Sequence, residues 1–275
     1  MGLNYANLSK TPKTFQSLSG VSVEEFRKIV EIARSGYGEL MAQKKSAGRN
    51  SGFSSLEDKV LCILMYYRTY VSQTFLGYLF GLHNANVCRM MKKVEPLLAG
   101  ALSIRKDRTL TEQKVMAILA DVTEINTQRP EKKQKEKYSG KKKRHTLKAE
   151  MAIREDGCII HVSKVYGGRT HDFKIRKSEK PFQRDSVKIV DSGYQGLQKR
   201  ERNVWLPYKG SKKKPLSPEQ KSHNRALASL RVKIENKFAE FKTFKILSDK
   251  YRNFQKKLHL RINIIAGLLN LRHGF

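Results

Sequence analysis

The chain reads VMAILADV from Val115 to Val122, and this stretch decides the fold. It is a short apolar run with a carboxylate near its end, which is typical of a buried β-strand. Similar runs follow at Thr146–Ile153, Ile159–Val165 and Val187–Val190, and helical patterns come after them. Strands mixed with later helices indicate an α/β sheet domain. We expect this domain to occupy residues 106–275.

Two aspartates lie at the ends of these expected strands. Asp121 comes near the end of the first apolar run, and Asp191 directly follows Val190 and precedes the turn-forming pair Ser192-Gly193. Ligand-binding groups in α/β sheets gather at strand ends, so both carboxylates are well placed for a functional site. The alternative is that each Asp only caps a turn.

A third carboxylate comes from a helix that we expect to begin near Ser217. Pro218 suits the first helical position, and Gln220 completes a capping box with Ser217. On a helical projection Glu235 lies in a polar stripe beside an apolar stripe, at the edge of a buried face. The polar stripe comprises Asn224, Arg231, Glu235 and Lys242, and the apolar stripe comprises Leu227, Leu230, Ile234, Phe238 and Phe241.

These three carboxylates could converge on a metal ion. An unpaired buried carboxylate is costly, so a divalent cation is a natural partner for three of them. Hard oxygen ligands favour Mg²⁺ or Mn²⁺ over zinc, and two such ions can promote in-line attack on a phosphodiester. Because the chain has 25 acidic residues, spacing alone leaves other sets of three open.

The chain is strongly basic, with 56 Lys and Arg against 25 Asp and Glu and a net charge of +31. Its hydrophobic fraction of 39% is too high for a disordered basic tail. We therefore expect a folded protein whose partner is a polyanion, most simply nucleic acid. Two basic runs, Arg129–Glu150 and Lys199–Lys214, are broken by aromatic residues, which suits loops that touch a phosphate backbone. Solvated loops are the alternative.

Several classes of protein are excluded by the sequence. Cys62, Cys88 and Cys158 are far apart and form no C-x-x-C pair, which argues against a disulfide framework and a zinc site. No apolar run approaches the roughly 20 residues of a membrane span, and the first residues lack the apolar block of a signal peptide. We expect a cytoplasmic protein with no membrane partner.

The segment 1–105 reads as helical. Ser22 and Glu25 form a capping box at the start of a helix expected over Ser22–Arg34, and a second helix is expected over Leu56–Tyr67. The periodicity at helical spacing is carried in the first helix by Val23, Phe26, Ile29, Val30 and Ala33.

A pair of shorter helices follows, at Gln73–Phe80 and Asn86–Val94, with Pro96 close behind. Two short helices joined by a turn that contains Gly81 are typical of a helix-turn-helix, which we place at about 56–94. On the second helix Asn86, Arg89 and Lys93 face one way, where they could contact phosphates and base edges, whereas Val87, Met91 and Val94 can face the core. Simple helix packing is the alternative.

Blocks of the sequence occur in an order that resembles one known family. They are Asp121–Ile125, Gln128–Pro130, Tyr138–Lys148, His171-Asp172, Asp191–Gly196, Arg231–Leu247 and Tyr251–Asn253. Together they closely resemble bacterial insertion-sequence transposases of the DDE superfamily, in the group named after insertion sequence five. The resemblance spans roughly Ser54 to the C-terminus.

The resemblance implies an RNase H-like mixed sheet flanked by helices, preceded by an all-α helix-turn-helix domain. It implies that Asp121, Asp191 and Glu235 are the catalytic residues and hold Mg²⁺, which Mn²⁺ could replace, as two ions. Arg231 and Lys242 fit the family's helix signature around this Glu, whereas Ala228 stands where related enzymes often have Tyr. The short spacing between Asp191 and Glu235 leaves no room for the large domain inserted in some relatives.

The function implied is that of a DNA transposase, an Mg²⁺-dependent endonuclease and strand transferase. It would bind the terminal inverted repeats of its element, hydrolyse a phosphodiester and use the freed 3′-hydroxyl to attack target DNA. Its partner is double-stranded DNA at the element ends and the target, and it acts as a homo-oligomer in the bacterial nucleoid without a small-molecule cofactor. Residues expected to contact DNA are Asn86, Arg89, Lys93, Lys141, Lys142, Lys143, Arg144, Arg231 and Lys242. The alternatives are an endonuclease of the same fold without strand transfer and a non-catalytic DNA-binding regulator.

Three residues near the expected site have simpler interpretations. Glu124 would point to the opposite face of a strand from Asp121, which favours a structural role. His171 suits a helix N-terminal cap, and Trp205 suits the core.

Overall fold

The computed structural model describes residues 2–42, 52–53, 55–102, 104 and 116–275, which belong to two compact units. One unit, here called the helical unit, contains residues 1–103, 242–249 and 260–275. The other, here called the sheet unit, contains residues 104–241 and 250–259. The expected boundary between residues 105 and 106 lies outside the described residues.

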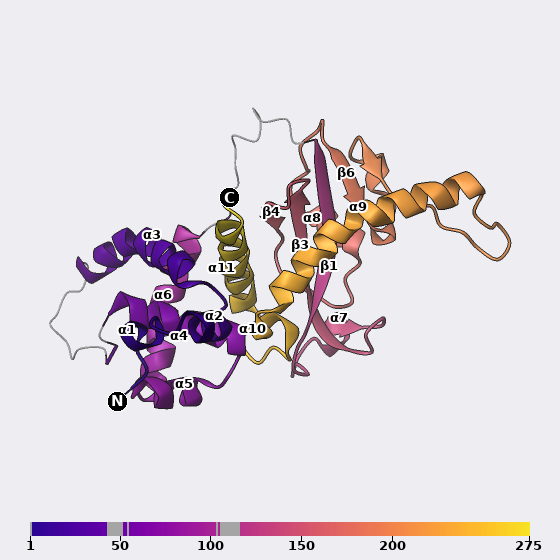
Figure 1. Cartoon of the computed structure of the whole chain (residues 1–275). Coiled ribbons are helices and arrows are strands. Elements are labelled where there is room, and N and C mark those ends of the chain that lie inside the picture. The colour runs from indigo at the N-terminus through magenta and orange to yellow at the C-terminus, as the bar shows by residue number, and fades with distance from the viewer. Residues whose placement is uncertain (1, 43–51, 54, 103, 105–115) are drawn as a thin grey trace. The chain divides into compact units, whose positions relative to one another are not determined.

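The helical unit consists of helices from both ends of the chain (Figure 1). They are α1 (Tyr5–Leu8), α2 (Pro12–Ser19), α3 (Val23–Ala42), α4 (Leu56–Thr69), α5 (Gln73–Phe80), α6 (Asn84–Ala101), α10 (Lys245–Ser248) and, from Leu260 onward, α11 (Lys256–Arg272). Arg261 of α11 donates to the carboxylate of Glu95 on α6 at 2.8 Å, and the Tyr67 hydroxyl donates to the same group at 3.1 Å. Both charged side chains are almost fully buried, so the last helix is part of this core.

Local sequence signals explain where the first long helices begin. The capping box expected before α3 is confirmed, since the Ser22 amide donates to the Glu25 carboxylate at 2.7 Å and the Glu25 amide donates to the Ser22 hydroxyl at 3.1 Å. The expected apolar face of α3 is also confirmed by the burial of Phe26, Ile29 and Val30. The helix continues to Ala42, past the end expected from its periodicity.

The helix pair α5 and α6 is joined by Gly81, Leu82 and His83. Gly77 allows this turn to lie against α5, because a Cβ atom there would come within 2.4 Å of the Leu82 carbonyl oxygen. The helix α6 was expected to end before Pro96, and this was wrong, because α6 runs through Pro96 to Ala101. Pro96 is exposed, so water can satisfy the carbonyl that the missing amide leaves free.

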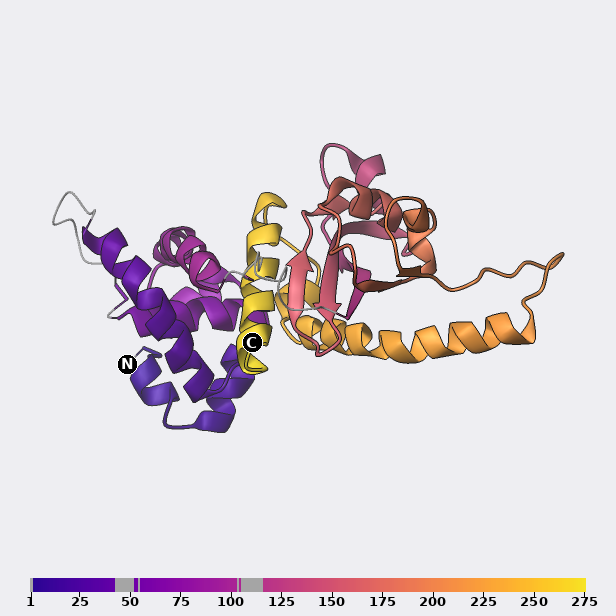
Figure 2. The same cartoon turned by 90° about the horizontal axis from the view of Figure 1, so that it is seen from above.

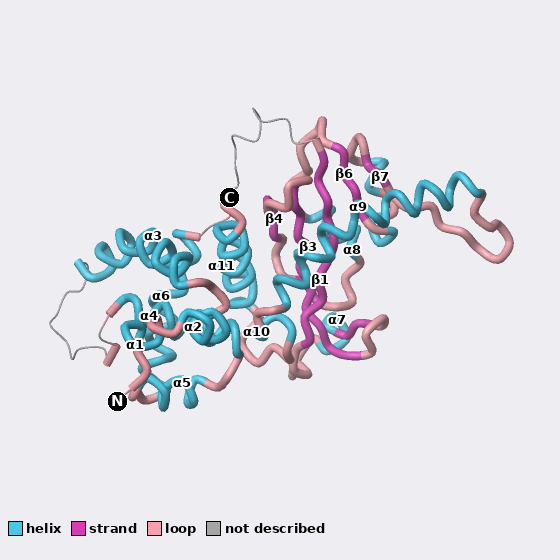
Figure 3. The backbone as a smooth tube through the Cα atoms, in the orientation of Figure 1, coloured by secondary structure: helices cyan, strands magenta, loops and turns pink. Residues whose placement is uncertain are grey.

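The sheet unit is built on a mixed sheet in the order β2-β3-β1-β6-β7, with β4 and β5 also paired to β3 (Figure 3). The strands are β1 (Ala117–Asn126), β2 (Tyr138–Ser139), β3 (Arg144–Arg154), β4 (Ile159–Val162), β5 (Tyr166–Gly167), β6 (Val187–Val190) and β7 (Val204–Trp205). Strand β1 pairs with β3 antiparallel and with β6 parallel. The α/β fold expected of an RNase H-like core, with a mixed sheet flanked by helices, is confirmed.

Helices cover the sheet. They are α7 (Gln134–Lys137), α8 (Asp172–Ser178) and α9 (Pro218–Lys242), with short 3₁₀ turns at Ser192–Tyr194 and Leu197–Lys199. An apolar cluster lies against the sheet, where Ile118 and Ala120 of β1 pack with Tyr194 and with Phe173 of α8. Figures 1 and 2 show α9 lying across the sheet, with its N-terminal part extending beyond the strands.

The start of α9 follows its sequence signal. The Gln220 amide donates to the Ser217 hydroxyl at 3.2 Å and the Ser217 amide donates to the Gln220 side chain at 3.1 Å, which confirms the expected capping box. The expected apolar stripe is buried at Leu227 and Ile234 but is wrong at Leu230, which is 40% exposed. No helix among the described residues is both long and apolar enough to cross a membrane.

Candidate active site and nucleic-acid interface

Strand pairing brings Asp121 and Asp191 next to each other. In the parallel pair of β1 and β6, Ala120 lies opposite Val190, so the two aspartates follow at the next position of each strand. Asp191 follows the end of β6 as expected, and its carboxylate accepts from the Ser192 amide at 2.6 Å. Asp121 was expected near a strand end, whereas β1 continues to Asn126 and leaves Asp121 in mid-strand.

One guanidinium joins both carboxylates. Arg231 of α9 lies 3.1 Å from Asp121 through one terminal nitrogen and 3.3 Å from Asp191 through the other. The side chains of Asp121 and Arg231 are 19% and 17% exposed, and that of Asp191 is 36% exposed. Burial, opposed by the Val122 amide and by Arg231 and assisted by the charge of Asp191, raises the pKa of Asp121. The site therefore holds concentrated negative charge that favours a cation.

Glu235 lies one helical turn beyond Arg231, so both residues project from the same face of α9. Its side chain is exposed, and the described residues contain no group of three His, Cys, Asp or Glu close enough to hold a metal ion. The structure thus brings Asp121 and Asp191 together but does not gather Glu235 with them. Because the single charge of Arg231 balances only one of the two aspartates, a third carboxylate beside them would add repulsion without a further cation.

Glu124 makes its contacts away from the two aspartates. It accepts from the Ser139 hydroxyl at 3.2 Å and lies 3.4 Å from the ammonium group of Lys148. Lys148 also lies 3.0 Å from Asp172, the first residue of α8. This partly buried chain of contacts agrees with a structural role for Glu124. His171 occupies the N-cap position of α8, but its side chain makes no capping hydrogen bond.

The contact between Ser139 and Glu124 also holds a basic turn. The Ser139 hydroxyl accepts from the amide of Lys142 at 3.2 Å, which fixes the backbone between β2 and β3. The turn carries four of the expected DNA-contacting residues, which are Lys141, Lys142, Lys143 and Arg144. All four are exposed. Lys242 is the last residue of α9 and is exposed as well.

The exposed face of α6 has the predicted composition. Asn86, Arg89 and Lys93 are exposed, and Arg89 donates to the side chain of Asn86 at 2.9 Å. Val87, Met91 and Val94 are buried, as expected from the periodicity; their exposed fractions are 0%, 1% and 2%. The second helix of the pair therefore presents polar donors to solvent while its opposite face packs in the core.

Sequence reasoning missed a second polar group beneath the sheet. Glu150 is fully buried, and it accepts from Arg176 at 2.6 Å and from the Tyr194 hydroxyl at 3.1 Å. Burial, opposed by Arg176, raises the pKa of Glu150 to about 7. A Glu within an apolar strand was the available signal. The interpretation of Trp205 as a core residue was wrong, since Trp205 is 45% exposed.

The sequence matches two families of known proteins. Residues 120–270 match the family described as DDE superfamily endonuclease, and residues 55–104 match the helix-turn-helix of DDE superfamily endonuclease. Both matches agree with the resemblance seen in the ordered sequence blocks. They imply a nuclease that binds DNA and uses a divalent metal ion.

Two named relatives extend over most of the chain. A protein of Microchaete diplosiphon, named as the probable transposase for insertion sequence element IS702, is 34% identical over 265 residues, which are 94% of each chain. A protein of Streptomyces albus G, named as the putative transposase for insertion sequence element IS112, is 25% identical over 242 residues, which cover 86% of this chain and 87% of the relative. Because the endonuclease family covers more than half of the sequence and the first relative matches nearly all of it, the chain belongs to the DDE superfamily of endonucleases.

Proposed function

We propose that this chain is a DNA transposase that cuts the ends of its own element and joins the freed 3′-hydroxyl to target DNA. The observation that carries the proposal is the pair of aspartates on adjacent parallel strands, joined by Arg231 from α9. The names of the two relatives support the same reaction, since each describes a transposase of an insertion sequence.

The donor set fits a divalent metal ion. Asp121 and Asp191 offer hard oxygen atoms side by side, and burial makes an unneutralised charge on Asp121 costly. Glu235, on the same face of α9 as Arg231, would be the third ligand after a change of side-chain conformation. We propose Mg²⁺, which Mn²⁺ could replace, held as two ions by these three carboxylates. When bound, the metal would polarise the phosphoryl group and activate the oxygen nucleophile.

Arg231 would change partners during the reaction. In the structure it pairs with both aspartates, and its Nε donor is buried without a hydrogen-bond partner among the described residues. Once other cations neutralise the aspartates, its guanidinium would be free to hold a phosphate oxygen in a forked arrangement. Lys242, at the end of the same helix, would contact a phosphate further along the strand.

Residues of both units would hold the DNA. We propose that Asn86, Arg89 and Lys93 of α6 read the terminal inverted repeat, since the second helix of a helix-turn-helix enters the major groove. The basic turn of Lys141, Lys142, Lys143 and Arg144 would hold the phosphate backbone of the same DNA. Joining two ends requires an active site at each end, so we propose a homo-oligomer on paired ends.

The test uses a supercoiled plasmid that carries the DNA flanking the gene. The wild-type chain should cut and join this DNA only when Mg²⁺ or Mn²⁺ is present. Asp121→Asn, Asp191→Asn and Glu235→Gln should each lower the cleavage rate by about 100-fold or more, because each removes a charged ligand. Glu219→Gln is the matched control, since Glu219 is an exposed acid in the first turn of α9.

The outcomes separate the candidate functions. Metal-dependent cleavage that survives Asp121→Asn would refute the assignment of this site. Cleavage without joined products would indicate an endonuclease that lacks strand transfer. A chain that binds the flanking DNA but never cuts it would indicate a DNA-binding regulator.

A further inference from the structure

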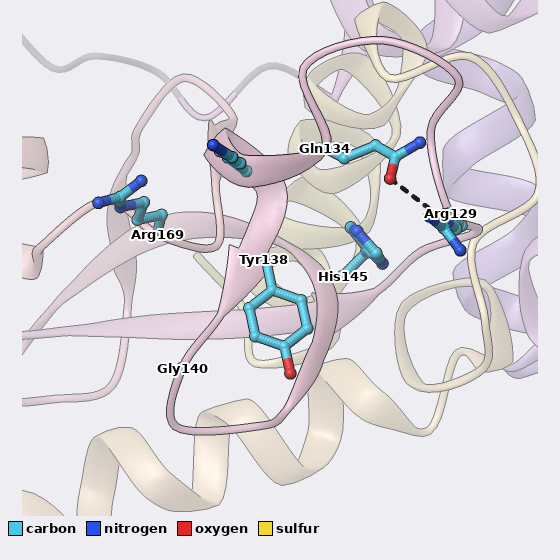
Figure 4. Close-up of a pocket in the computed structure, with 7 residues that line it drawn as sticks. Arg129, Gln134, Tyr138, Gly140, His145 and Arg169 are labelled. Atoms are coloured by element: carbon cyan, nitrogen blue, oxygen red, sulfur yellow. Dashed lines mark hydrogen bonds between the residues drawn. The ribbon is translucent and has the colours of Figure 1, made fainter.

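A pocket of about 570 Å³ opens in the sheet unit beside the basic turn, and its lining residues come from several elements (Figure 4). They are Arg129, Gln134, Lys135, Tyr138, Gly140, His145 and Arg169. Arg129 follows β1, Gln134 and Lys135 belong to α7, and Arg169 follows β5. None of the lining residues is acidic, and three are basic.

Two aromatic rings line this pocket together with two arginines. Tyr138 and His145 are a cross-strand pair of β2 and β3, with ring centroids 5.5 Å apart in an edge-to-face arrangement. The Tyr138 ring is 41% exposed. Figure 4 shows Arg129 and Arg169 on opposite sides of the two rings, and the Arg129 Nε donates to Gln134 at 3.0 Å. Arg169 and Lys135 have no acidic partner among the described residues.

The backbone around the pocket is fixed closely. The Gly168 amide donates to the Thr146 carbonyl at 2.9 Å, and the Arg169 amide donates to the Glu136 carbonyl at 3.2 Å. A Cβ atom on Gly168 would come within 2.1 Å of the Thr146 hydroxyl oxygen, and one on Gly167 within 2.4 Å of the Glu136 carbonyl. The backbone that carries Arg169 therefore packs closely against α7 and β3. The pocket is thus formed in the absence of a ligand.

Resting on the proposed DNA transposase function, we infer that this pocket binds a single unstacked nucleotide of the DNA substrate. The base would stack on the Tyr138 ring, and the phosphate would pair with Arg169 or Arg129. A duplex hides the faces of its bases within the stack, so the Tyr138 ring can stack only on a base that has left the stack. A site for duplex phosphates alone would need the cations but not the exposed ring.

The pocket lies apart from the two aspartates. From Asp121 to Asn126 the strand β1 advances five residues, about 17 Å at roughly 3.4 Å per residue. Asn126 pairs with Thr146, the neighbour of His145 in the pocket. The nucleotide in the pocket would therefore lie apart from the scissile phosphate.

The test measures DNA binding by the full chain, without cleavage. The probes are a fluorescent single strand of twenty thymidines, a blunt duplex of equal length and a duplex with an unpaired 2-aminopurine. Tyr138→Ala should weaken binding of the single strand about tenfold, leave the blunt duplex within about twofold and reduce the quenching of 2-aminopurine. Tyr138→Phe should retain wild-type values, because its ring can still stack. Phe254→Ala, which removes another exposed ring of the sheet unit, is the matched control.

A second variant tests the basic side chains of the pocket. Arg169→Ala should weaken single-strand binding and lower the slope of log affinity against log salt by about one. Lys174→Ala, an exposed cation on α8, is the control. If Tyr138→Ala weakens both DNAs equally, the pocket holds duplex backbone and the inference is wrong. Wild-type binding by both Tyr138→Ala and Arg169→Ala would also overturn the inference. A failure of the proposed transposase function would appear in the cleavage assay and would not change these binding results.

Discussion

The sheet unit holds its acidic and basic groups in opposite ways. Asp121 and Asp191 are partly buried and share one guanidinium, whereas the lysines of the basic turn are exposed. A charge on a partly buried carboxylate costs free energy unless a cation lies beside it. Such a carboxylate is therefore suited to exchange one cation for another during a reaction. A charged ammonium group at the surface stays hydrated, so its charge costs little free energy in the folded chain. Such a group is suited to bind a phosphate backbone. The difference indicates which charges serve chemistry and which serve binding.

The largest expected effect tests the acidic half of this comparison. Arg231→Ala should lower cleavage of the flanking DNA by about 100-fold, because a donor to the phosphate is lost. The same variant should bind Mn²⁺ more tightly than the wild type when no DNA is present, because a competing cation has left Asp121 and Asp191. Isothermal titration with MnCl₂ measures this. Weaker Mn²⁺ binding by the variant would mean that Arg231 organises the aspartates and does not compete for them.

The basic turn gives the next largest effect. A triple alanine variant of Lys141, Lys142 and Lys143 should weaken binding of a blunt duplex about tenfold or more and lower the salt slope by about three. Cleavage at saturating DNA should stay near the wild-type rate, since the turn would hold DNA without touching the reacting atoms. The control is a triple alanine variant of three exposed lysines on or beside α2 and α3, namely Lys10, Lys13 and Lys28. An unchanged salt slope in the first variant would contradict the proposed grip.

A third prediction concerns the buried acid that takes no part in the proposed chemistry. The pKa of Glu150 in the folded chain, about 7, lies above its ordinary value of 4.5, so folding favours the protonated form. Its contribution to stability is therefore present below pH 4.5 and is lost as the pH rises through about 7. The free energy of unfolding should fall by about 2 kcal/mol more between pH 5 and 7 in the wild type than in Glu150→Gln.

Urea unfolding at a series of pH values measures this difference. Glu219→Gln, which changes an exposed acid, should follow the wild-type curve. Parallel curves for the wild type and Glu150→Gln would show that Arg176 keeps the Glu150 carboxylate ionised throughout.

The smallest expected effect tests the helix that carries Arg231 and Glu235. Ser217→Ala removes the hydroxyl that accepts from the Gln220 amide, and it should cost about 1 kcal/mol of unfolding free energy. Ser222→Ala, at an exposed position inside α9, should be nearly neutral. Thermal unfolding followed by circular dichroism distinguishes the two. Equal stability of both variants would mean that packing alone fixes the start of α9.

Much of the fold could be predicted because its signals are local. The capping boxes at Ser22 and Ser217 involve residues three apart, and the strand runs at β1, β3 and β6 are marked by their own side chains. The length of α6 could not be predicted, because the tolerance of Pro96 depends on its exposure. The exposure of Leu230 was missed as well, because an apolar pattern does not show which positions of the stripe are covered in the folded chain.

The candidate site divides in the same way. Asp121, Asp191 and Arg231 could be selected from sequence, but the shared guanidinium could not, since it joins residues 110 and 40 positions apart. The exposed position of Glu235 depends on the charges around it and not on helical spacing alone. The pocket around Tyr138 was also missed, because its walls come from separate elements that only the folded chain brings together.

The buried pair of Glu95 and Arg261 has a consequence for how the chain is made. Glu95 is translated long before Arg261, yet it is fully buried in the completed helical unit and bonded to that arginine. A ribosome that stops before residue 261 would release a chain that lacks both this cation and the part of α11 that belongs to the same unit. The helices around α6 would then mature only after the last helix emerges, so truncated products would be poor DNA binders and good protease substrates.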